Sequence, residues 1–423
     1  MKSFLPSLFA AALLFAPLAA SAQPNPDAGP GRGGRGGRGG GAPAVRSPEV
    51  SDDYRVTFRL RAPGAQAVNL LSDFSGDTIA MKKGDDGVWS YTTEPLTPGY
   101  YQYWYTMDGL TLPDPANTYV RNASGVYKSL VDVRGPGTEW MDFRDVPHGT
   151  LHEHTYINRE SGTERRVVIY TPPGYAKSTQ SYPVIYLLHG LNDFERGWTV
   201  NGRAHYIYDN LLADKKAVPA IVVMPFLHEV TGASGRQAEI AAVRTALGVT
   251  PPAAGGRGAG APGAGAPGGG RGAAAPAGTT SGSPYMERDI LNNLAPLVES
   301  EYRTLKGPKN QAIIGYSMGG SAALSIGFAH PDLFSYVAAF SFPFAPQNST
   351  GLADVEKANK DYRLIWLGSG TADTQGYRST LAFHEQLKAR GIKSEFTASE
   401  GYRHDYQIWR IYLRDVLPKL FRE

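Results

Sequence analysis

The stretch QAIIGYSMGGSAALSIG, residues 311–327, decides the fold predicted for this chain. Its apolar start reaches Gly315-Tyr-Ser317-Met-Gly319 and passes at once into small residues, 320–328, with helical character. This order is typical of a nucleophile elbow, in which a strand turns sharply into a helix and presents a serine at the turn. Glycine adopts the strained backbone at little cost and lets the strand and the helix cross closely. The stretch therefore predicts that Ser317 is presented as a nucleophile at a strand end.

A serine hydroxyl becomes a nucleophile only beside a base that a third group holds, so the motif requires an acid and a histidine further along the chain. A Gly-x-Ser-x-Gly pattern alone can also arise by chance in a chain with 50 glycines among 423 residues. The apolar run before Ser317 and the small-residue segment after it favour the elbow over a chance match.

The length of 423 residues suits two domains rather than one. Residues 1–22 contain one Lys, an apolar stretch interrupted by two Pro, and a small-residue site that ends at Ala22. This pattern predicts a cleavable secretory signal, cut after Ala22, and a secreted or periplasmic protein. The chain has no Cys, which excludes a thioether lipid anchor, disulfides and a cysteine nucleophile. The net charge of +3 gives no reason to expect a nucleic-acid partner.

Two tracts have a strongly biased composition. Residues 29–41 read GPGRGGRGGRGGG, and residues 255–282 are rich in Gly, Ala and Pro. Arg-Gly-Gly repeats bind RNA in some disordered tails, but no Phe or Tyr is interleaved here for base stacking. We therefore expect spacers, with residues 23–46 as a disordered linker.

The region 47–136 has the alternating pattern of β-strands. Residues 54–61, YRVTFRLR, alternate apolar and polar side chains with period two. Further short strands, separated by turns rich in Gly, Pro and Asp, are expected at 67–71, 87–92, 100–107 and 126–133. Short strands at this spacing predict a small all-β sandwich.

The strand expected at 100–107 begins YYQYWY and is aromatic on both of its faces. One face must belong to the core of the sandwich. The other face has two explanations that the sequence leaves open: a platform on which a sugar ring stacks, or a surface that packs against a second domain.

The region 145–423 alternates strand and helix patterns, which predicts an α/β domain with a doubly wound, mostly parallel sheet. The expected strands are 166–170, 184–188, 220–224, 312–314, 336–340, 363–367 and 393–398. The expected helices are 205–216, 285–303, 320–328, 380–390 and one from Asp405. Ligands of such a domain gather at the carboxyl ends of the strands.

The acid of the site is predicted to be Asp373. The chain order in such domains is serine, acid, histidine, and Asp373 comes just after the strand expected at 363–367. Asp361 precedes that strand and should lie at the wrong edge of the sheet. Asp354 lies in a predicted charged loop, and Glu400 comes one loop too late.

The base is predicted to be His404. Only His384 and His404 follow the acid, and His384 falls within a helical pattern. His404 lies in a loop after the last expected strand, which is where the base of this arrangement belongs.

Two backbone N–H groups are predicted to bind the oxyanion. One belongs to Met318, directly after the nucleophile, and the other to Leu191, in the loop after the strand 184–188. His189 begins that loop, and we expect it to shape the loop. The sequence contains no HExxH motif, Asp-rich motif or Cys/His cluster, so neither a metal nor another cofactor is predicted.

Four segments resemble one family of enzymes. They are residues 189–225, GYSMGG around Ser317, GSGTAD ending at Asp373, and GYRHDYQIWR around His404. They resemble the carbohydrate esterases that include feruloyl and acetyl xylan esterases, which are related to enterochelin and S-formylglutathione esterases. The region 47–136 is similar to the immunoglobulin-like early-set domain that precedes the catalytic domain in many bacterial xylan-acting esterases.

The resemblance implies an α/β-hydrolase domain after a small immunoglobulin-like sandwich, with Ser317, Asp373 and His404 as triad and Leu191 and Met318 as oxyanion donors. It implies an exported serine esterase that removes feruloyl or acetyl groups from plant cell-wall xylan through an acyl-enzyme. The expected partner is an acylated polysaccharide or oligosaccharide, without nucleic acid or a membrane anchor. A siderophore esterase of the enterochelin type and a non-catalytic carbohydrate-binding protein are the alternatives. The oligomeric state is not predicted.

The sequence departs from the family pattern at residues 225–228, where the family usually has an Asn-Gly turn. A low-complexity insertion, about 229–284, follows at once. Because it leaves a strand at the carboxyl end, we expect it to overhang the active site and influence the choice of substrate. The candidate substrate-binding residues, chosen by position alone, are Trp198, Phe226, His228 and Tyr402.

Overall fold

The computed structural model describes residues 44–422 apart from 124–125, 192, 229–283, 344 and 347–348. The expected signal peptide, nearly all of the N-terminal linker and the low-complexity insertion therefore lie outside the described residues. Within the described ranges, no helix has the length and apolar character needed to cross a membrane.

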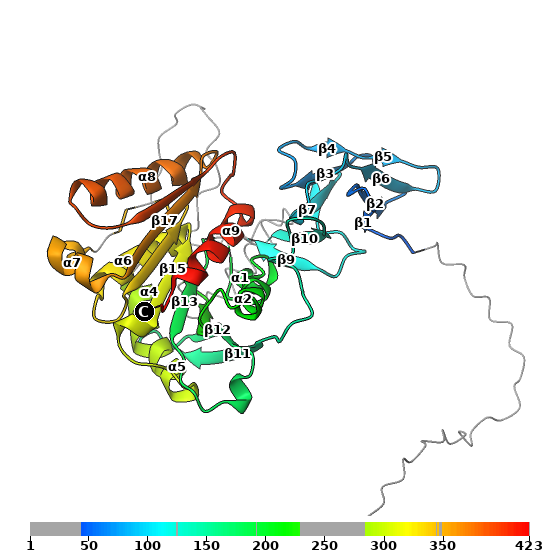
Figure 1. Ribbon diagram of the computed structural model, residues 1–423. Helices are drawn as coiled ribbons and strands as arrows, with labels where there is room; N and C mark the ends of the chain where they lie inside the picture. Colours follow the sequence, from blue (N-terminus) through cyan, green and yellow to red (C-terminus); the bar gives the residue numbers. More distant parts are fainter. Residues whose placement is uncertain are drawn as a thin grey trace, which may run out of the picture. The chain divides into compact units, whose positions relative to one another are not determined.

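The first part of the described chain is a sandwich of two antiparallel sheets (Figure 1). One sheet has the strand order β1-β2-β6-β5, and the other has the order β4-β3-β7-β10-β9 with β8 beside β7. The strands are β1 (Glu49–Val50), β2 (Val56–Arg61), β3 (Val68–Ser72), β4 (Ile79–Ala80), β5 (Lys82–Lys83), β6 (Val88–Thr92), β7 (Gly99–Met107), β8 (Leu110–Leu112), β9 (Val120–Ala123) and β10 (Val126–Val133).

The alternation of apolar and polar residues that predicted β2 matches the alternating burial of its side chains. Val56, Phe58 and Leu60 are buried in the sandwich core, while the residues between them are half-buried. From the facing sheet, Tyr103 and Tyr105 of β7 enter the same core. The sandwich is thus held by alternating side chains from both sheets, as the sequence predicted.

The second face of β7 packs against the α/β domain. Tyr100 lies in a hydrophobic cluster formed mainly by residues of that domain, and the guanidinium of Arg203 lies 3.8 Å from the centre of its ring. On the same face Trp104 is half-buried, with the ammonium of Lys128 3.9 Å from its ring centre. Of the two explanations for these aromatic residues, packing against a second domain is the one that the contacts of Tyr100 support.

The second part is built on a sheet that has eight strands among the described residues, in the order β11-β12-β14-β13-β15-β16-β17-β18. β11 and β12 are antiparallel additions at one edge, and the six strands β13 to β18 pair in parallel. The strands are β11 (Thr150–Ile157), β12 (Glu164–Thr171), β13 (Val184–Leu188), β14 (Ile221–Pro225), β15 (Gln311–Tyr316), β16 (Tyr336–Phe340), β17 (Leu364–Gly370) and β18 (Glu395–Ser399).

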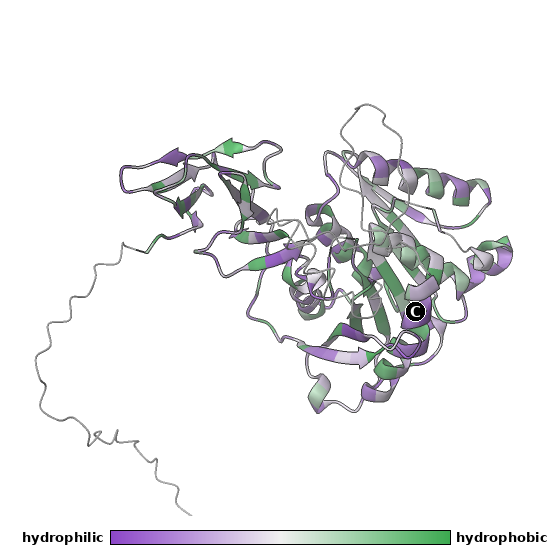
Figure 2. Cartoon of the chain, turned by 180° about the vertical axis from the view of Figure 1, so that it is seen from behind, coloured by the Kyte–Doolittle hydropathy of each residue, from purple (hydrophilic) through white to green (hydrophobic). Residues whose placement is uncertain are grey.

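Helices cover both faces of this sheet. Side chains of α2 and α9 share one cluster with alternate strand residues, and side chains of α4 to α8 share the other. Figure 2 colours the inner strands as mostly hydrophobic, which agrees with a sheet that is buried on both faces. The helices are α1 (Gly197–Val200), α2 (Ala204–Ala213), α4 (Pro284–Asp289), α5 (Ala295–Glu301), α6 (Met318–Ala329), α7 (Val355–Asp361), α8 (Thr374–Ala389) and α9 (Tyr406–Val416).

Some elements differ from the sequence expectations. The helix expected at 285–303 consists of α4, a π-helical turn (Ile290–Leu294) and α5. The charged loop expected around Asp354 is the short helix α7, and the side chain of Asp354 caps it by accepting the N–H of Lys357 at 3.0 Å. Strand β11 was not predicted, because its exposed and half-buried residues lack the continuous apolar run of the inner strands.

Candidate active site

Ser317 lies between β15 and α6 in a strained conformation. Its φ of 54° and ψ of −123° fall where a residue with a side chain is rarely found, so the surrounding contacts must hold it there. Its N–H donates to Phe340 O at 2.8 Å, and its carbonyl accepts the N–H of Ser321 at 3.0 Å. The turn is therefore fixed from the neighbouring strand and from the first turn of α6.

The small residues of the motif are required by close backbone contacts. A Cβ on Gly315 would lie 2.2 Å from Gly319 O, and a Cβ on Gly319 would lie 2.4 Å from His189 O. Both obstacles are backbone atoms and cannot rotate away. The sequence argument that strand and helix cross too closely for a side chain therefore has a direct counterpart in the structure.

The structure brings Ser317, His404 and Asp373 into one hydrogen-bonded row. His404 Nε2 lies 2.9 Å from Ser317 Oγ, and His404 Nδ1 lies 2.6 Å from Asp373 Oδ2. Asp373 follows β17 and caps α8, where its Oδ1 accepts the N–H of Gly376 at 3.0 Å. The imidazole can thus take a proton from Ser317 on one side while the carboxylate orients it from the other.

The environment of Asp373 favours its charged form. Burial would raise the pKa of this carboxyl, but hydrogen bonds from His404, from the N–H of Gly376 and from the hydroxyl of Ser341 outweigh the burial and lower the pKa below its ordinary value. The rejected acids are placed elsewhere: Asp361 forms an ion pair with Lys357 on α7, and Glu400 is exposed.

The expected oxyanion donors lie on two sides of Ser317. Met318 is the first residue of α6, so its N–H has no acceptor within the helix. On the other side, a Cβ built on Gly190 would lie 3.2 Å from Ser317 Cβ, so the loop that holds Leu191 lies against the elbow. Both N–H groups remain candidates for stabilising an oxyanion beside Ser317.

His189 braces this loop as a neutral residue. It is 1% exposed, and its Nε2 accepts the N–H of Leu227 at 3.0 Å, which places the proton on Nδ1. Nδ1 then donates to Gly190 O at 2.7 Å. Burial lowers the pKa of His189 well below its ordinary value, so the ring keeps this arrangement at neutral pH.

A buried carboxylate that the sequence did not single out connects the parts of the site. Asp193 Oδ2 accepts the hydroxyls of Tyr316 at 2.6 Å and Tyr406 at 2.7 Å, and Arg121 Nη2 lies 3.2 Å away. Tyr316 precedes Ser317, and Arg121 comes from β9 of the sandwich. Asp193 was part of the resembling segment 189–225, but no local spacing relates it to these partners.

The four candidate substrate-binding residues have different positions. Trp198 is 1% exposed, donates Nε1–H to Leu188 O at 3.1 Å and packs edge-on against Tyr316. Because the core encloses Trp198, its side chain packs against Tyr316 of the elbow and does not reach a substrate. Its assignment to the substrate pocket was wrong. Tyr402 is 38% exposed and lies in the loop before His404, so it remains a candidate.

Phe226 and His228 lie beside the loop after β13 that carries the expected oxyanion donor Leu191, which is called the oxyanion loop below. The ring of Phe226 stacks on Phe194 with ring centres 5.8 Å apart, and it is 9% exposed. His228 Nε2 lies 3.1 Å from Asp193 O. These two residues are therefore placed at the edge of the loop that carries Leu191, and they remain candidates for substrate contact.

The two ends of the insertion meet at one buried arginine, Arg165. Its guanidinium donates to Phe226 O and His228 O, before the insertion, and its Nε donates to Asp289 Oδ2 at 3.0 Å, after it. Tyr156 and Asn158 also donate to Asp289, at 2.9 and 2.7 Å. The departure point and the return point of the insertion are thus tied together inside the domain.

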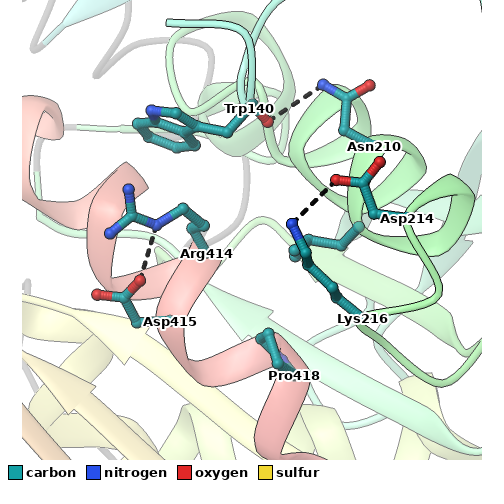
Figure 3. A pocket seen from close by; sticks show the side chains of 8 residues that line it. Trp140, Asn210, Asp214, Lys216, Arg414, Asp415 and Pro418 are labelled. Atoms are coloured by element: carbon teal, nitrogen blue, oxygen red, sulfur yellow. Dashed lines mark hydrogen bonds and ion pairs between the residues drawn. The ribbon is translucent and has the colours of Figure 1, made fainter. Parts of the chain in front are cut away.

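A separate cavity of about 430 Å³ contains no member of the Ser317–His404–Asp373 row (Figure 3). It lies between α2, the C-terminal part of α9 and the segment before β11. Its lining residues are Trp140, Asn210, Leu211, Asp214, Lys216, Arg414, Asp415 and Pro418. Among the described residues, no group of His, Asp or Glu side chains is arranged to hold a metal ion.

Comparisons with known proteins match both parts of the chain. A family model described as putative esterase matches residues 159–246 and 235–420, and the model of carbohydrate-binding module 48, the isoamylase N-terminal domain, matches residues 44–127. A curated relative, an endo-1,4-beta-xylanase/feruloyl esterase of Xylanibacter ruminicola, is 28% identical over 388 residues. These are 90% of this chain and 46% of that protein, so the chain spans about half the length of this relative.

Solved structures share the fold at low identity. The enterochelin esterase of Shigella flexneri is 17% identical, with a TM-score of 0.58 over 88% of this chain and 94% of that chain. A ferulic acid esterase of Anaeromyces mucronatus is 20% identical, with a TM-score of 0.49 over 68% of this chain and 96% of that chain. The first of these likenesses extends over the sandwich as well as the α/β domain.

Proposed function

The chain belongs to the family of putative esterases, which are carboxylic ester hydrolases, and on this premise we propose that it removes feruloyl or acetyl groups from plant cell-wall xylan. The observation that carries the proposal is the hydrogen-bonded row of Ser317, His404 and Asp373 at the carboxyl edge of a parallel sheet. The predicted signal in residues 1–22 fits an exported enzyme that meets a polymeric substrate outside the cell.

The proposed reaction has two steps through an acyl-enzyme. His404 takes the proton of Ser317 Oγ as this oxygen attacks the ester carbonyl, and the N–H groups of Leu191 and Met318 stabilise the oxyanion. The protonated His404 gives its proton to the leaving alcohol of the sugar. Water, deprotonated by His404, then attacks the acyl-enzyme, and the carboxylic acid leaves as Ser317 regains its proton. Asp373 holds the imidazole throughout.

Support for the substrate class comes from the relatives. The relative from Xylanibacter ruminicola carries feruloyl esterase in its name, and the front sandwich matches a carbohydrate-binding module. A siderophore esterase is the second candidate, because the likeness to the enterochelin esterase of Shigella flexneri covers 88% of this chain. A non-catalytic carbohydrate-binding protein is disfavoured by the complete row at Ser317.

A substrate panel with one active-site variant tests this proposal. The full chain and Ser317→Ala are assayed on methyl ferulate, acetylated xylan and a triscatecholate siderophore, with Ser300→Ala, an exposed serine on α5, as the matched control. We expect the wild type to hydrolyse ferulate or acetyl esters. The kcat should fall by about 10⁶-fold in Ser317→Ala and stay unchanged in Ser300→Ala. Preference for the siderophore would overturn the substrate class, and activity of Ser317→Ala within tenfold of wild type would overturn the mechanism.

A further inference from the structure

The structure assigns a positioning role in the active site to Arg121, a residue of the front sandwich. Resting on the proposed function, we propose that Arg121 holds Asp193 and through it the oxyanion loop, the nucleophile strand and the base. The sandwich is then a part of the catalytic machinery in addition to any contact that it makes with a carbohydrate.

Arg121 reaches out of its own domain. It belongs to β9, which pairs with β10, yet its side chain is only 10% exposed and its Nη2 lies 3.2 Å from Asp193 Oδ2. Its Nη1 donates to Gln102 Oε1 of β7 at 3.1 Å, which fixes the guanidinium from the sandwich side. The guanidinium carbon lies 5.5 Å from the ring centre of Tyr406. The cation thus has one anchor in the sandwich and its charge partner in the α/β domain.

Asp193 has contacts with segments next to each reacting group. It lies in the same loop as Leu191, and its Oδ1 accepts the N–H of Phe194 at 3.0 Å. Its Oδ2 accepts the hydroxyl of Tyr316, the residue before Ser317, and that of Tyr406 in the first turn of α9. One carboxylate therefore sets the relative position of the oxyanion loop, the elbow and the start of α9.

The tyrosines remain hydrogen-bond donors to this carboxylate. Burial, followed by the charge of Asp193, raises the pKa of both Tyr316 and Tyr406 well above the ordinary value of 10.0. Tyr316 also stacks on Trp409 with ring centres 3.9 Å apart, and Trp409 meets the His404 ring edge-on at 5.0 Å. A displacement of Asp193 would therefore reach the base as well as the oxyanion loop.

The charge of Arg121 is needed because Asp193 is buried. The side chain of Asp193 is 4% exposed, and a buried carboxylate is stable as an anion only with a charged or strongly hydrogen-bonding partner. Among the described residues, Arg121 is the cation that forms an ion pair with it. Without this cation we expect the carboxylate of Asp193 to turn toward water, which releases the loop.

Two further contacts between the sandwich and the α/β domain, those of Arg203 and Arg410, do not involve the oxyanion loop, and Arg203 provides a matched control. Arg203 of the α/β domain is 8% exposed at its side chain and pairs with Asp132 of β10 at 2.6 Å. Arg410 of α9 donates to Tyr100 O of β7 at 2.8 Å. Loss of the Arg203 side chain removes an interdomain ion pair that is buried to a similar degree as that of Arg121. It leaves the ion pair between Arg121 and Asp193 intact.

The test compares Arg121→Met, Arg121→Lys and Arg203→Met in the full chain. Each is assayed with p-nitrophenyl acetate, and a fluorophosphonate that labels the active serine counts the competent sites. We expect Arg121→Met to lower kcat per labelled site by about 10- to 100-fold with KM within about threefold, because a misplaced oxyanion donor weakens transition-state binding but not substrate binding. Arg121→Lys should recover part of the rate, since lysine keeps the positive charge but lacks the planar guanidinium with its several N–H donors.

A purely structural role for Arg121 predicts different numbers. In that case both Arg121 variants resemble Arg203→Met, with a lower melting temperature or fewer labelled sites but with kcat per labelled site within twofold of wild type, and this result overturns the inference. If Arg121→Met does not fold, a kcat per labelled site in Arg121→Lys that is at least threefold below wild type supports the inference, and a value within twofold refutes it. Wild type without esterase activity would refute the proposed function itself, which is a distinct outcome.

Discussion

The carboxyl of Asp73 should make the stability of the protein depend on pH in an unusual direction. Asp73 follows β3 at the border of the sandwich, and its Oδ1 and Oδ2 accept the backbone and side-chain N–H groups of Gln102 at 2.9 and 3.3 Å. Burial raises the pKa of Asp73 from 3.8 to about 7, and the negative charge of Asp405, the residue that follows His404 in the chain, adds to the rise. Hydrogen bonds from Gln102 and the charge of Arg410 oppose it. The folded chain therefore keeps a proton that the unfolded chain releases.

The sign of the effect follows from this difference in proton binding. Between pH 3.8 and about 7 the folded state binds more protons than the unfolded state, so the contribution of Asp73 to stability is lost as pH rises through this window. The shift corresponds to an upper bound of about 4 kcal/mol, at ~1.36 kcal/mol for each tenfold change in proton affinity. Two effects reduce this bound: water reaches the half-buried carboxyl, and the substitution weakens one hydrogen bond to Gln102. We therefore expect Asp73→Asn to raise the free energy of unfolding by about 1–3 kcal/mol at pH 8.

Urea unfolding of Asp73→Asn and wild type at pH 5 and pH 8 measures this effect. We expect the variant to be more stable than wild type at pH 8 and to gain little or nothing at pH 5, with a flatter pH dependence between them. Asp52→Asn, which removes an exposed carboxylate of the same domain, is the matched control and should change stability at neither pH. An Asp73→Asn variant that is less stable than wild type at pH 8 would refute the reasoning, because it would mean that the charged form of Asp73 stabilises the fold.

Four further outcomes are expected. Asp373→Asn should lower kcat by about 10⁴-fold, measured on methyl ferulate, and a dead Glu400→Gln beside a near-normal Asp373→Asn would identify a different acid. Gly319→Ala should abolish activity or soluble expression, because the added Cβ meets a backbone oxygen at 2.4 Å; normal kinetics would contradict the close contact at the elbow. Deletion of 47–135 should give an insoluble or early-melting protein, and an unchanged melting temperature would contradict the domain packing. Replacing 255–282 by a short Gly-Ser linker should leave the melting temperature within a few degrees, since closure entropy depends only logarithmically on length.

The sequence predicted the elbow and the row of Ser317, His404 and Asp373 because these features are local. Each of them is encoded by a strand end, a turn or a small-residue requirement that can be recognised within about ten residues. The capping of α7 was equally local. Asp354 precedes the helix as a capping residue, and attention to that signal would have predicted a helix in place of a charged loop.

The residues that the sequence did not reveal act through contacts between distant segments. Arg121 and Asp193 meet only because the sandwich packs on the α/β domain, and neither residue lies in a spacing pattern that points to the other. Trp198 was misassigned for a related reason. Its position after the oxyanion loop was the only ground for the assignment, whereas the rings of Tyr316 and Tyr406 enclose it. Side-chain direction after a loop depends on tertiary packing, which a periodic pattern does not encode.

Arg165 has a consequence for how this protein can change over evolutionary time. Because its guanidinium ties Phe226 O and His228 O to Asp289, the two chain ends at this point are held together whatever sequence connects them. Lengthening a loop between fixed ends is inexpensive, at about 0.6 kcal/mol for each doubling. We expect lineages of this enzyme to differ in length here more than at any other loop near Ser317. The same junction is a natural place to splice in a foreign domain whose termini lie close together.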